Sequence, residues 1–228
     1  MNLAPTLVPL GVLYARSMRG QLWVGLVLAV VGCGGDESCD LGKSQLRLTG
    51  VLAFEPGACT VDADGPLLAN GVMDRLLTDR YVAMLKIENP GEADVAVRGA
   101  SVVLSDTEGN SLREFTVDGG GLAKPGEAIA SQAIVVPGPS GLPDHVIASI
   151  TAEGETPSGT RVKSQALTFT VQLCSGCLIE YPVDAMDAAT ALCSRMPDED
   201  LIEPCVFGQD TMVDCRLCAM TVAECLSP

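Results

Sequence analysis

The stretch Gln165–Leu173, which reads QALTFTVQL, decides the fold. Its apolar side chains occupy every second position from Leu167 to Leu173, and threonine or glutamine fills the positions between them. Successive side chains of a strand point to opposite faces of a sheet, so this alternation predicts a β-strand with one buried face.

The same period of two recurs earlier in the chain. Shorter strands are expected over residues 112–117, 128–136 and 146–152. The clearest apolar faces consist of Leu46, Leu48, Leu52 and Phe54; of Tyr81, Ala83, Leu85 and Ile87; and of Ala100, Val102 and Leu104.

Glycine and proline clusters separate these stretches, since glycine permits positive φ and proline fixes φ. About seven short strands at this spacing predict a mainly β fold, an antiparallel immunoglobulin-like (Ig-like) β-sandwich over residues 44–173. Residues 65–80 do not alternate and are expected to form a short helix or a long loop. The clusters are residues 89–91, 106–110, 119–121, 125–126 and 137–141.

The strand-turn-strand over residues 85–97, LKIENPGEADVAV, resembles a V-x-N-x-G pattern found in many bacterial sandwich domains. The resemblance covers only these few residues. It agrees with the sandwich that the alternation predicts.

The composition changes at Cys174, where a cysteine-rich tail begins (residues 174–228). The tail has few large apolar residues, so we expect disulfides to replace part of its core. Residues 184–196 have helical character, with Asp184 as the N-cap of a short helix. The tail cysteines are Cys174, Cys177, Cys193, Cys205, Cys215, Cys218 and Cys225.

Two CxxC motifs lie in the tail: the first motif is CSGC (174–177) and the second motif is CRLC (215–218). Together they have a tolerable spacing for a four-cysteine zinc site, although thiolate zinc sites suit reducing compartments. A thioredoxin-like redox motif is the other functional reading, but no βαβ pattern surrounds either motif. Structural disulfides are favoured over both, so no metal, cofactor or catalytic residue is predicted.

An export signal lies in the first 33 residues. Arg16 and Arg19 precede an apolar run over residues 22–32, shorter than the about 20 residues that span a membrane. The run ends in VVGC (30–33), which resembles the lipobox of bacterial lipoproteins. The resemblance implies a signal peptide over residues 1–32, cleavage before Cys33, and acylation of Cys33 to form a membrane anchor. An ordinary secretory signal with an incidental Cys33 is the alternative.

The same signal predicts the first residue of the protein and the membrane to which it is sent. Residues 1–15 carry no positive charge, so we expect the true start at Met18, and residues 33–43 as a lipidated tether. Cys33 is followed by Gly34 and Gly35 rather than by the aspartate that holds lipoproteins at the inner membrane of well-studied Gram-negative bacteria. The resemblance therefore implies the cell envelope, and the outer membrane rather than the inner one.

Counting cysteines leaves an odd thiol. The chain has ten, and lipidation of Cys33 leaves nine. We expect Cys39 to pair with Cys59, which leaves seven in the tail; alternatively Cys39 pairs with the tail and Cys59 is free. The disulfide candidates are Cys39, Cys59, Cys174, Cys177, Cys193, Cys205, Cys215, Cys218 and Cys225.

The charge excludes one class of partner. Removing residues 1–32 removes two arginines and no acidic residue, so the net charge of −15 becomes −17. A phosphate backbone repels such a chain, so nucleic acid is not a partner. His145, the only histidine, cannot build a zinc hydrolase alone, and DADG (62–65) is a turn rather than a complete calcium loop.

The sequence therefore predicts a non-enzymatic envelope lipoprotein that is a binding or structural module. Its partners would be the membrane, through the lipid, and an unknown envelope protein or surface ligand. The alternative is a thiol-redox or metal-binding protein that acts through the two CxxC motifs.

Overall fold

The computed structural model describes residues 46–55, 58–187, 192–193, 201, 203–219, 222, 225 and 227. The expected signal peptide (1–32) and lipidated tether (33–43) lie outside this range. The described chain is mainly β, as predicted. Its strands are β1 (Arg47–Leu52), β2 (Leu67–Leu68), β3 (Gly71–Asp74), β4 (Arg80–Glu88), β5 (Val95–Ser105), β6 (Ser111–Ala123), β7 (Ala128–Pro137), β8 (His145–Glu155), β9 (Arg161–Lys163), β10 (Leu167–Cys174), β11 (Ile179–Glu180) and β12 (Val213–Asp214).

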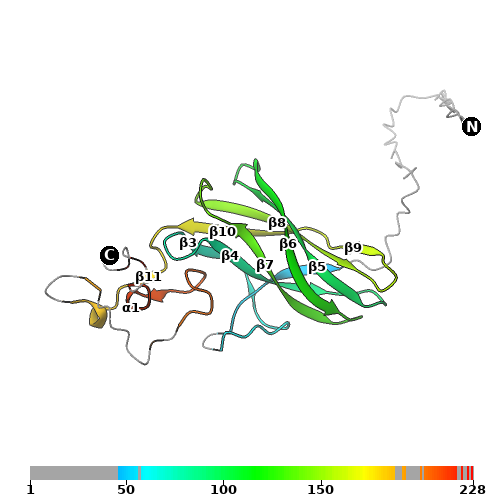
Figure 1. Ribbon diagram of the computed structural model, residues 1–228, viewed down its shortest axis with the longest axis horizontal. Helices are drawn as coiled ribbons and strands as arrows, with labels where there is room; N and C mark the ends of the chain where they lie inside the picture. Colours follow the sequence, from blue (N-terminus) through cyan, green and yellow to red (C-terminus); the bar gives the residue numbers. More distant parts are fainter. Residues whose placement is uncertain are drawn as a thin grey trace, which may run out of the picture. The chain divides into compact units, whose positions relative to one another are not determined.

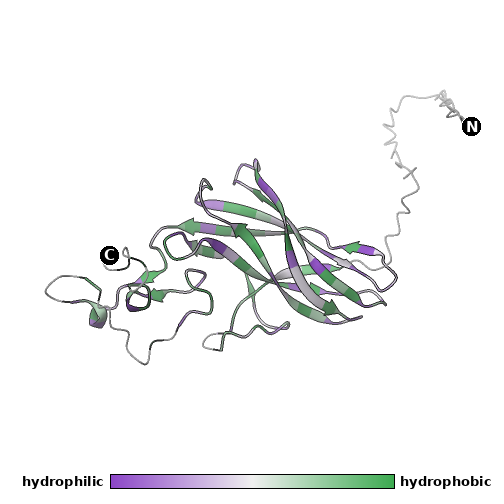
Figure 2. Ribbon diagram, in the orientation of Figure 1, coloured by the Kyte–Doolittle hydropathy of each residue, from purple (hydrophilic) through white to green (hydrophobic). Residues whose placement is uncertain are grey.

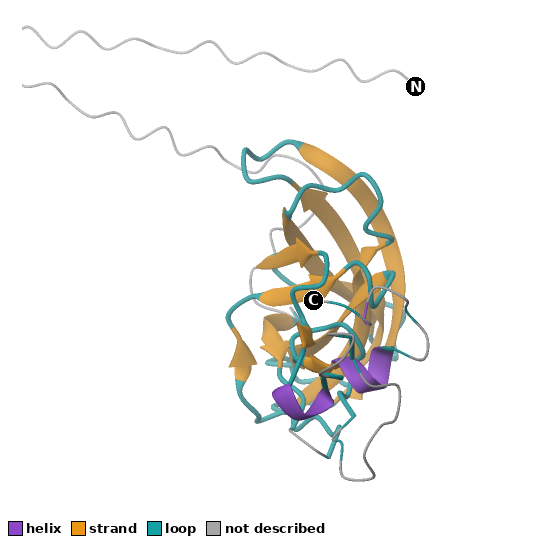
Figure 3. Ribbon diagram, turned by 90° about the vertical axis from the view of Figure 1, so that its left-hand side faces the viewer, coloured by secondary structure: helices purple, strands orange, loops and turns teal. Residues whose placement is uncertain are grey.

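Two sheets enclose one hydrophobic core (Figure 1). The first has the order β2-β1-β4-β7, and the second has the order β3-β10-β8-β5-β6, with β9 paired to β8. The second sheet curls strongly, which the long strands of Figure 3 show. The core draws side chains from both sheets, so each sheet covers the apolar face of the other. We call residues 46–173 the sheet region.

The predicted alternation is confirmed in the strands at the centre of both sheets. In β4, the predicted face is at most 2% exposed, and the residues that alternate with it are partly exposed; the face consists of Tyr81, Ala83, Leu85 and Ile87. In β10, Phe169 and Leu173 are buried in the same way. Figure 2 shows the result, strands on which hydrophobic and hydrophilic residues alternate.

The predicted face of the first strand is wrong beyond Leu48. The pairing of β1 with β4 shifts register between Leu48 and Gly50. A bulge adds one residue to a strand and reverses the faces beyond it. Val51 therefore joins the common core, where the unbroken pattern would have placed Leu52, and Phe54 lines a surface cavity instead.

Two further predictions are also wrong. The glycines at 119–121 do not end a strand but lie inside β6, where the β5–β6 pairing shifts register between Val97, which faces Gly121, and Gly99, which faces Asp118. Residues 65–80 form β2, β3 and a turn rather than a helix or long loop. Because β3 pairs with β10 in parallel, the fold is not wholly antiparallel.

The tail has a second, smaller core. It contains β11, β12, a 3-10 helix η1 (Val183–Ala185) and a short helix α1 (Cys215–Cys218). Buried cysteines make up half of this core, and Leu76 and Leu77 of the sheet region pack against it. Disulfides and a turn from the sheet region thus complete the core of the described tail. This agrees with the expectation that disulfides replace part of its core.

The predicted helix over residues 184–196 is wrong. Met186 and Cys193 form an antiparallel bridge, and the Asp187 amide donates to the Leu192 carbonyl at 2.8 Å. A helix would hold Met186 and Cys193 about 10 Å apart along its axis. The disulfide of Cys193 to Cys215 is the contact that the local pattern did not contain.

Within the part of the chain that the structure describes, no helix is both long and apolar enough to span a bilayer.

Candidate functional site

Eight of the ten cysteines lie among the described residues, and all eight are in disulfides. Cys33 and Cys39 lie outside the described residues. The disulfides are Cys59–Cys205, Cys174–Cys177, Cys193–Cys215 and Cys218–Cys225.

Cys59–Cys205 ties the tail to the sheet region. It replaces the expected Cys39–Cys59 pair, and it also excludes the alternative in which Cys59 is free. The two residues are 146 positions apart. Closing so long a loop removes unfolded-state entropy worth about 5 kcal/mol, whereas a disulfide across three residues is worth about 2 kcal/mol. This disulfide is therefore structural.

The second CxxC motif is structural as well. Cys215 pairs with Cys193 and Cys218 with Cys225, and all four are buried in the tail core. The structure therefore does not bring the two motifs together as a four-cysteine zinc site, and it leaves no dithiol within the second motif.

A nearly buried ion pair holds the second motif in place. The Asp214 carboxylate accepts from the Arg216 amide at 2.9 Å and caps the start of α1. The Arg216 guanidinium also donates to both oxygens of that carboxylate, at 3.0 and 2.7 Å. The Arg216 hydrogen bond lowers the pKa of Asp214, so the carboxylate is ionised at neutral pH.

The first motif forms a disulfide within itself, at the end of β10. Its loop rests on Asp74, a fully buried residue of β3. The Asp74 carboxylate accepts from the amides of Gly176 at 2.9 Å, Leu178 at 3.0 Å and Leu76 at 3.0 Å. Cys177 is exposed and Cys174 is half-buried, so solvent reaches the disulfide from one side.

Asp74 also lies close to both sulfurs of the first motif. One carboxylate oxygen and the two Sγ atoms are all within 4.8 Å of one another. These three groups could hold a metal only after reduction, because a disulfide sulfur is not a thiolate ligand. Sequence reasoning missed Asp74, since it lies 100 residues before the motif in a segment expected to be a helix or loop.

Residues 208–210 dock the tail onto β3 and β4. The Asp74 amide donates to the Gly208 carbonyl, and the Asp210 amide donates to the Val72 carbonyl. The Gln209 side chain binds both backbone groups of Val82, at 2.6 and 2.9 Å, where the β4 ladder shifts register. The tail is thus bound to β3, at the edge of the second sheet, by backbone hydrogen bonds like those between strands.

Asp210 and Tyr81 form a hydrogen bond at this junction. The Tyr81 hydroxyl donates to Asp210 at 2.6 Å. Burial, helped by the neighbouring carboxylate, raises the pKa of Tyr81, so the hydroxyl keeps its proton. Asp210 as a whole residue is exposed, but its carboxylate lies against Tyr81, and this desolvation raises the pKa of Asp210.

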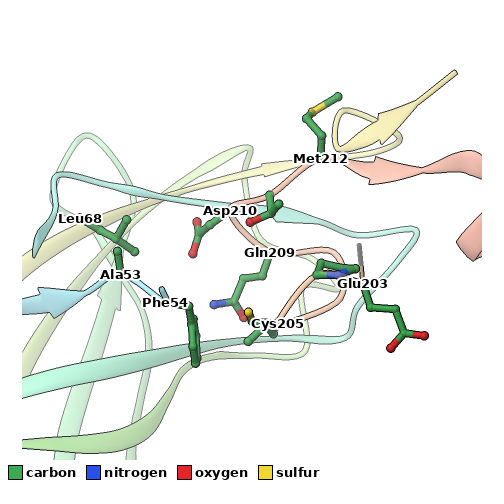
Figure 4. A pocket seen from close by; sticks show the side chains of 11 residues that line it. Ala53, Phe54, Leu68, Glu203, Cys205, Gln209, Asp210 and Met212 are labelled. Carbon is green, nitrogen blue, oxygen red and sulfur yellow. The ribbon is translucent and has the colours of Figure 1, made fainter. Parts of the chain in front are cut away.

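A cavity of about 450 Å³ opens beside this junction (Figure 4). Its volume is in the usual range of small-ligand sites. In Figure 4 the Glu203 carboxylate points away from Phe54, Gln209 and Asp210. Apolar side chains make up most of the remaining lining: Ala53, Leu68, Pro204, Val206 and Met212.

The other predicted features are peripheral. His145 is exposed at the start of β8, and the neighbouring Asp144 forms an ion pair with Arg75 at 3.3 Å. Asp62 accepts from the Asp64 and Gly65 amides, which confirms the turn at residues 62–65.

Comparisons with known proteins add no identity. No protein-family model matches the chain, and no curated protein matches it. Among solved structures, the chain is similar to Northeast Structural Genomics Consortium target SoR45 at 17% identity and a TM-score of 0.33, over 40% of this chain and 68% of that one. It is also similar to a candidate ApaA protein of Bordetella pertussis at 14% identity and a TM-score of 0.35, over 57% and 94%. Because both TM-scores are below 0.5, neither similarity carries a functional argument.

Proposed function

We propose that the protein is a non-enzymatic lipoprotein of the cell envelope, held to the membrane by lipidated Cys33, and that it acts as a binding or structural module. The observation that carries this proposal is the pairing of all eight described cysteines. Disulfides of this density persist in oxidising compartments, and a chain must be exported to reach one. The lipobox at residues 30–33 accounts for the export.

The four disulfides show which two cysteines are left outside the described pairs. Eight paired cysteines leave Cys33 and Cys39 of the original ten. Lipidation of Cys33 leaves Cys39 as a single thiol, which accounts for the odd number predicted from the sequence. Without lipidation, the two cysteines would give either two thiols or a fifth disulfide.

For the sheet region, we propose a sandwich of the fibronectin type III kind within the Ig-like class. Taken in chain order as strands A, B, C, C′, E, F and G, the strands β1, β4, β5, β6, β7, β8 and β10 divide into A-B-E and C′-C-F-G. This division is typical of fibronectin type III domains, and the shared core of the two sheets supports it. Such sandwiches serve binding on many unrelated proteins, so the fold alone names no ligand.

The cavity beside Phe54 is the binding site that we propose for the module. Its apolar lining suits an apolar group of a surface ligand or of an envelope protein, with Asp210 at one side to bind a polar end. The net charge of −17 after cleavage, from −15 less two arginines, opposes binding of nucleic acid. Gly34 and Gly35 favour the outer membrane, as the lipoprotein sorting pattern implies.

Palmitate labelling and thiol counting on the membrane-extracted protein test the anchor. The chain should incorporate label and show one alkylatable thiol, at Cys39, when unfolded without reductant. Cys33→Ser should be unlabelled and soluble and should still show one thiol, because Cys39 is unchanged. Continued labelling of Cys33→Ser, or an unlabelled wild-type chain with no thiol or with two, would contradict the proposal.

A further inference from the structure

We propose that the Cys174–Cys177 disulfide is a thiol–disulfide exchange site that accepts electrons from a dithiol of a partner peptide or protein. Cys177 is the sulfur that the partner attacks, and Cys174 is the sulfur that leaves. The inference goes beyond the proposed binding module and does not depend on the lipid anchor.

The loop of the first motif needs its disulfide less than any other part of the tail. The bond joins residues only three apart, the shortest separation among the four disulfides. The amides of Gly176 and Leu178 are already held by Asp74, and the Ile179 amide donates to the Gly176 carbonyl. These hydrogen bonds still hold the loop when the disulfide opens, and the two sulfurs stay close enough to close it again.

Access of a thiolate favours the same disulfide. Cys177 is exposed, whereas the four cysteines of Cys193–Cys215 and Cys218–Cys225 are buried. Cys59 is exposed as well, but its bond to Cys205 holds together segments 146 residues apart. Opening that bond separates these two segments. The first motif is therefore better suited to repeated exchange.

The exchange takes two steps. A partner thiolate attacks Sγ of Cys177, the S–S bond breaks, and Sγ of Cys174 leaves with the electron pair and takes a proton from water. The partner's second thiolate then attacks the partner sulfur of the mixed disulfide and releases Cys177, which is protonated in turn. The partner dithiol is oxidised to a disulfide, and Cys174–Cys177 is reduced to two thiols.

The surroundings of Cys174 suit a protonated thiol after reduction. Its Sγ lies 3.6 Å from the Met73 carbonyl oxygen, which can accept a hydrogen bond from an S–H group. The Asp74 oxygen within 4.8 Å repels a thiolate. Arg75 does not offset this charge, because its guanidinium pairs with Asp144 at 3.3 Å and donates to the Leu142 and Pro143 carbonyls. The reduced pair lacks the thiolate stabilisation of strongly oxidising motifs, so the disulfide is its resting state and only a partner dithiol of lower reduction potential opens it.

Two single variants test which sulfur reacts. Cys174→Ser leaves Cys177 as a thiol, and Cys177→Ser leaves Cys174. Each full-length variant is treated with glutathione disulfide, and the mixed disulfides are located by peptide mass mapping, which separates them from Cys39. We expect Cys177 to react roughly tenfold faster than Cys174 in the folded protein, and the two rates to become equal in denaturant.

The wild-type chain gives a second test that needs no variant. Dithiothreitol at low concentration should open Cys174–Cys177 while the other three disulfides remain closed. Equal rates of the two variants in the folded state, or opening of another disulfide first, would overturn the exchange site. Uptake of one Zn²⁺ per reduced chain, lost in Cys174→Ser, would replace it with a metal site built from Asp74, Cys174 and Cys177.

Discussion

The two CxxC motifs have the same spacing and opposite structures. The first ends a strand and forms a disulfide within itself, partly open to solvent. The second forms α1, and each of its cysteines pairs with a cysteine elsewhere in the buried core of the tail. The difference shows that the surroundings of a CxxC motif, rather than its spacing, determine whether it can act as a dithiol.

Different neighbours produce this difference. At the first motif, Gly176 adopts a φ of +77°, which turns the chain back so that Asp74 can bind the loop amides. At the second, Asp214 caps a helix, and the core that buries Cys215 and Cys218 also contains Cys193 and Cys225. The first loop is therefore held by hydrogen bonds, and the second motif is held by disulfides.

The largest expected effect comes from removing both cysteines of one motif. Cys215→Ala/Cys218→Ala opens two disulfides and should destabilise the tail by about 6 kcal/mol, since the loops close over 22 and 7 residues. Cys174→Ala/Cys177→Ala opens one disulfide across three residues and should cost about 2 kcal/mol. Limited proteolysis of the tail measures the difference. Equal sensitivity of the two double variants would mean that the motifs are structurally equivalent.

A smaller effect is expected at the ion pair beside the second motif. Asp214→Ala removes the cap of α1 and leaves the Arg216 side chain, which is 10% exposed, without its closest carboxylate, so we expect a loss of about 3 kcal/mol. Asp184→Ala is the matched control: it contacts the same guanidinium at 3.5 Å but is 74% exposed, and should cost less than about 1 kcal/mol. Denaturant unfolding gives both values, and similar losses would contradict the account of the second motif.

At the first motif, Gly176→Ala should cost about 1 kcal/mol, because a left-handed φ strains a residue with a Cβ. Opening the disulfide removes one restraint on the loop and lets part of this strain relax, so the fraction of Cys174–Cys177 that is open in a fixed glutathione buffer should rise. Ser175→Ala, in the same exposed loop, is the control and should leave this fraction unchanged. A Gly176→Ala variant with an unchanged fraction would show that Asp74 and the loop backbone do not set the redox equilibrium.

The smallest effect is a pH dependence of the tail. The lowered pKa of Asp214 means that its pairing with Arg216 stabilises the fold at neutral pH. This stabilisation is lost as the pH falls below the ordinary aspartate value and through the lowered one. Asp214→Asn should therefore lose less stability than the wild-type chain over that acidic range, in a thermal melt followed by tail proteolysis. Parallel curves would remove Asp214 from the account.

Local patterns predicted the strands well because a period of two is a property of neighbouring residues. The buried faces of β4, β5 and β10 follow directly from it. It failed at Val51 and at Gly119–Gly121, where register shifts depend on the partner strand. No local pattern marks such a shift, because the position of a bulge depends on how the strand pairs with its neighbour in the sheet.

The site was less predictable than the fold, because its contacts join residues far apart in the sequence. The Tyr81–Asp210 bond spans 129 residues, and the Gly176–Asp74 bond spans 102. Cysteine spacing indicated the presence of disulfides but left their pairing open, and the tail helix failed for the same reason, at Cys193. The only local signal at Asp74 is an acidic residue that follows two apolar ones, Val72 and Met73. This pattern is too common to single out Asp74.

The order in which the four disulfides open tests the contrast between the motifs most directly. The folded full-length protein is titrated with dithiothreitol, quenched with an alkylating reagent, and mapped by mass spectrometry. We predict that Cys174 and Cys177 are labelled first, while Cys193, Cys215, Cys218 and Cys225 remain protected until the tail unfolds. Labelling of the second motif before, or together with, the first would contradict it.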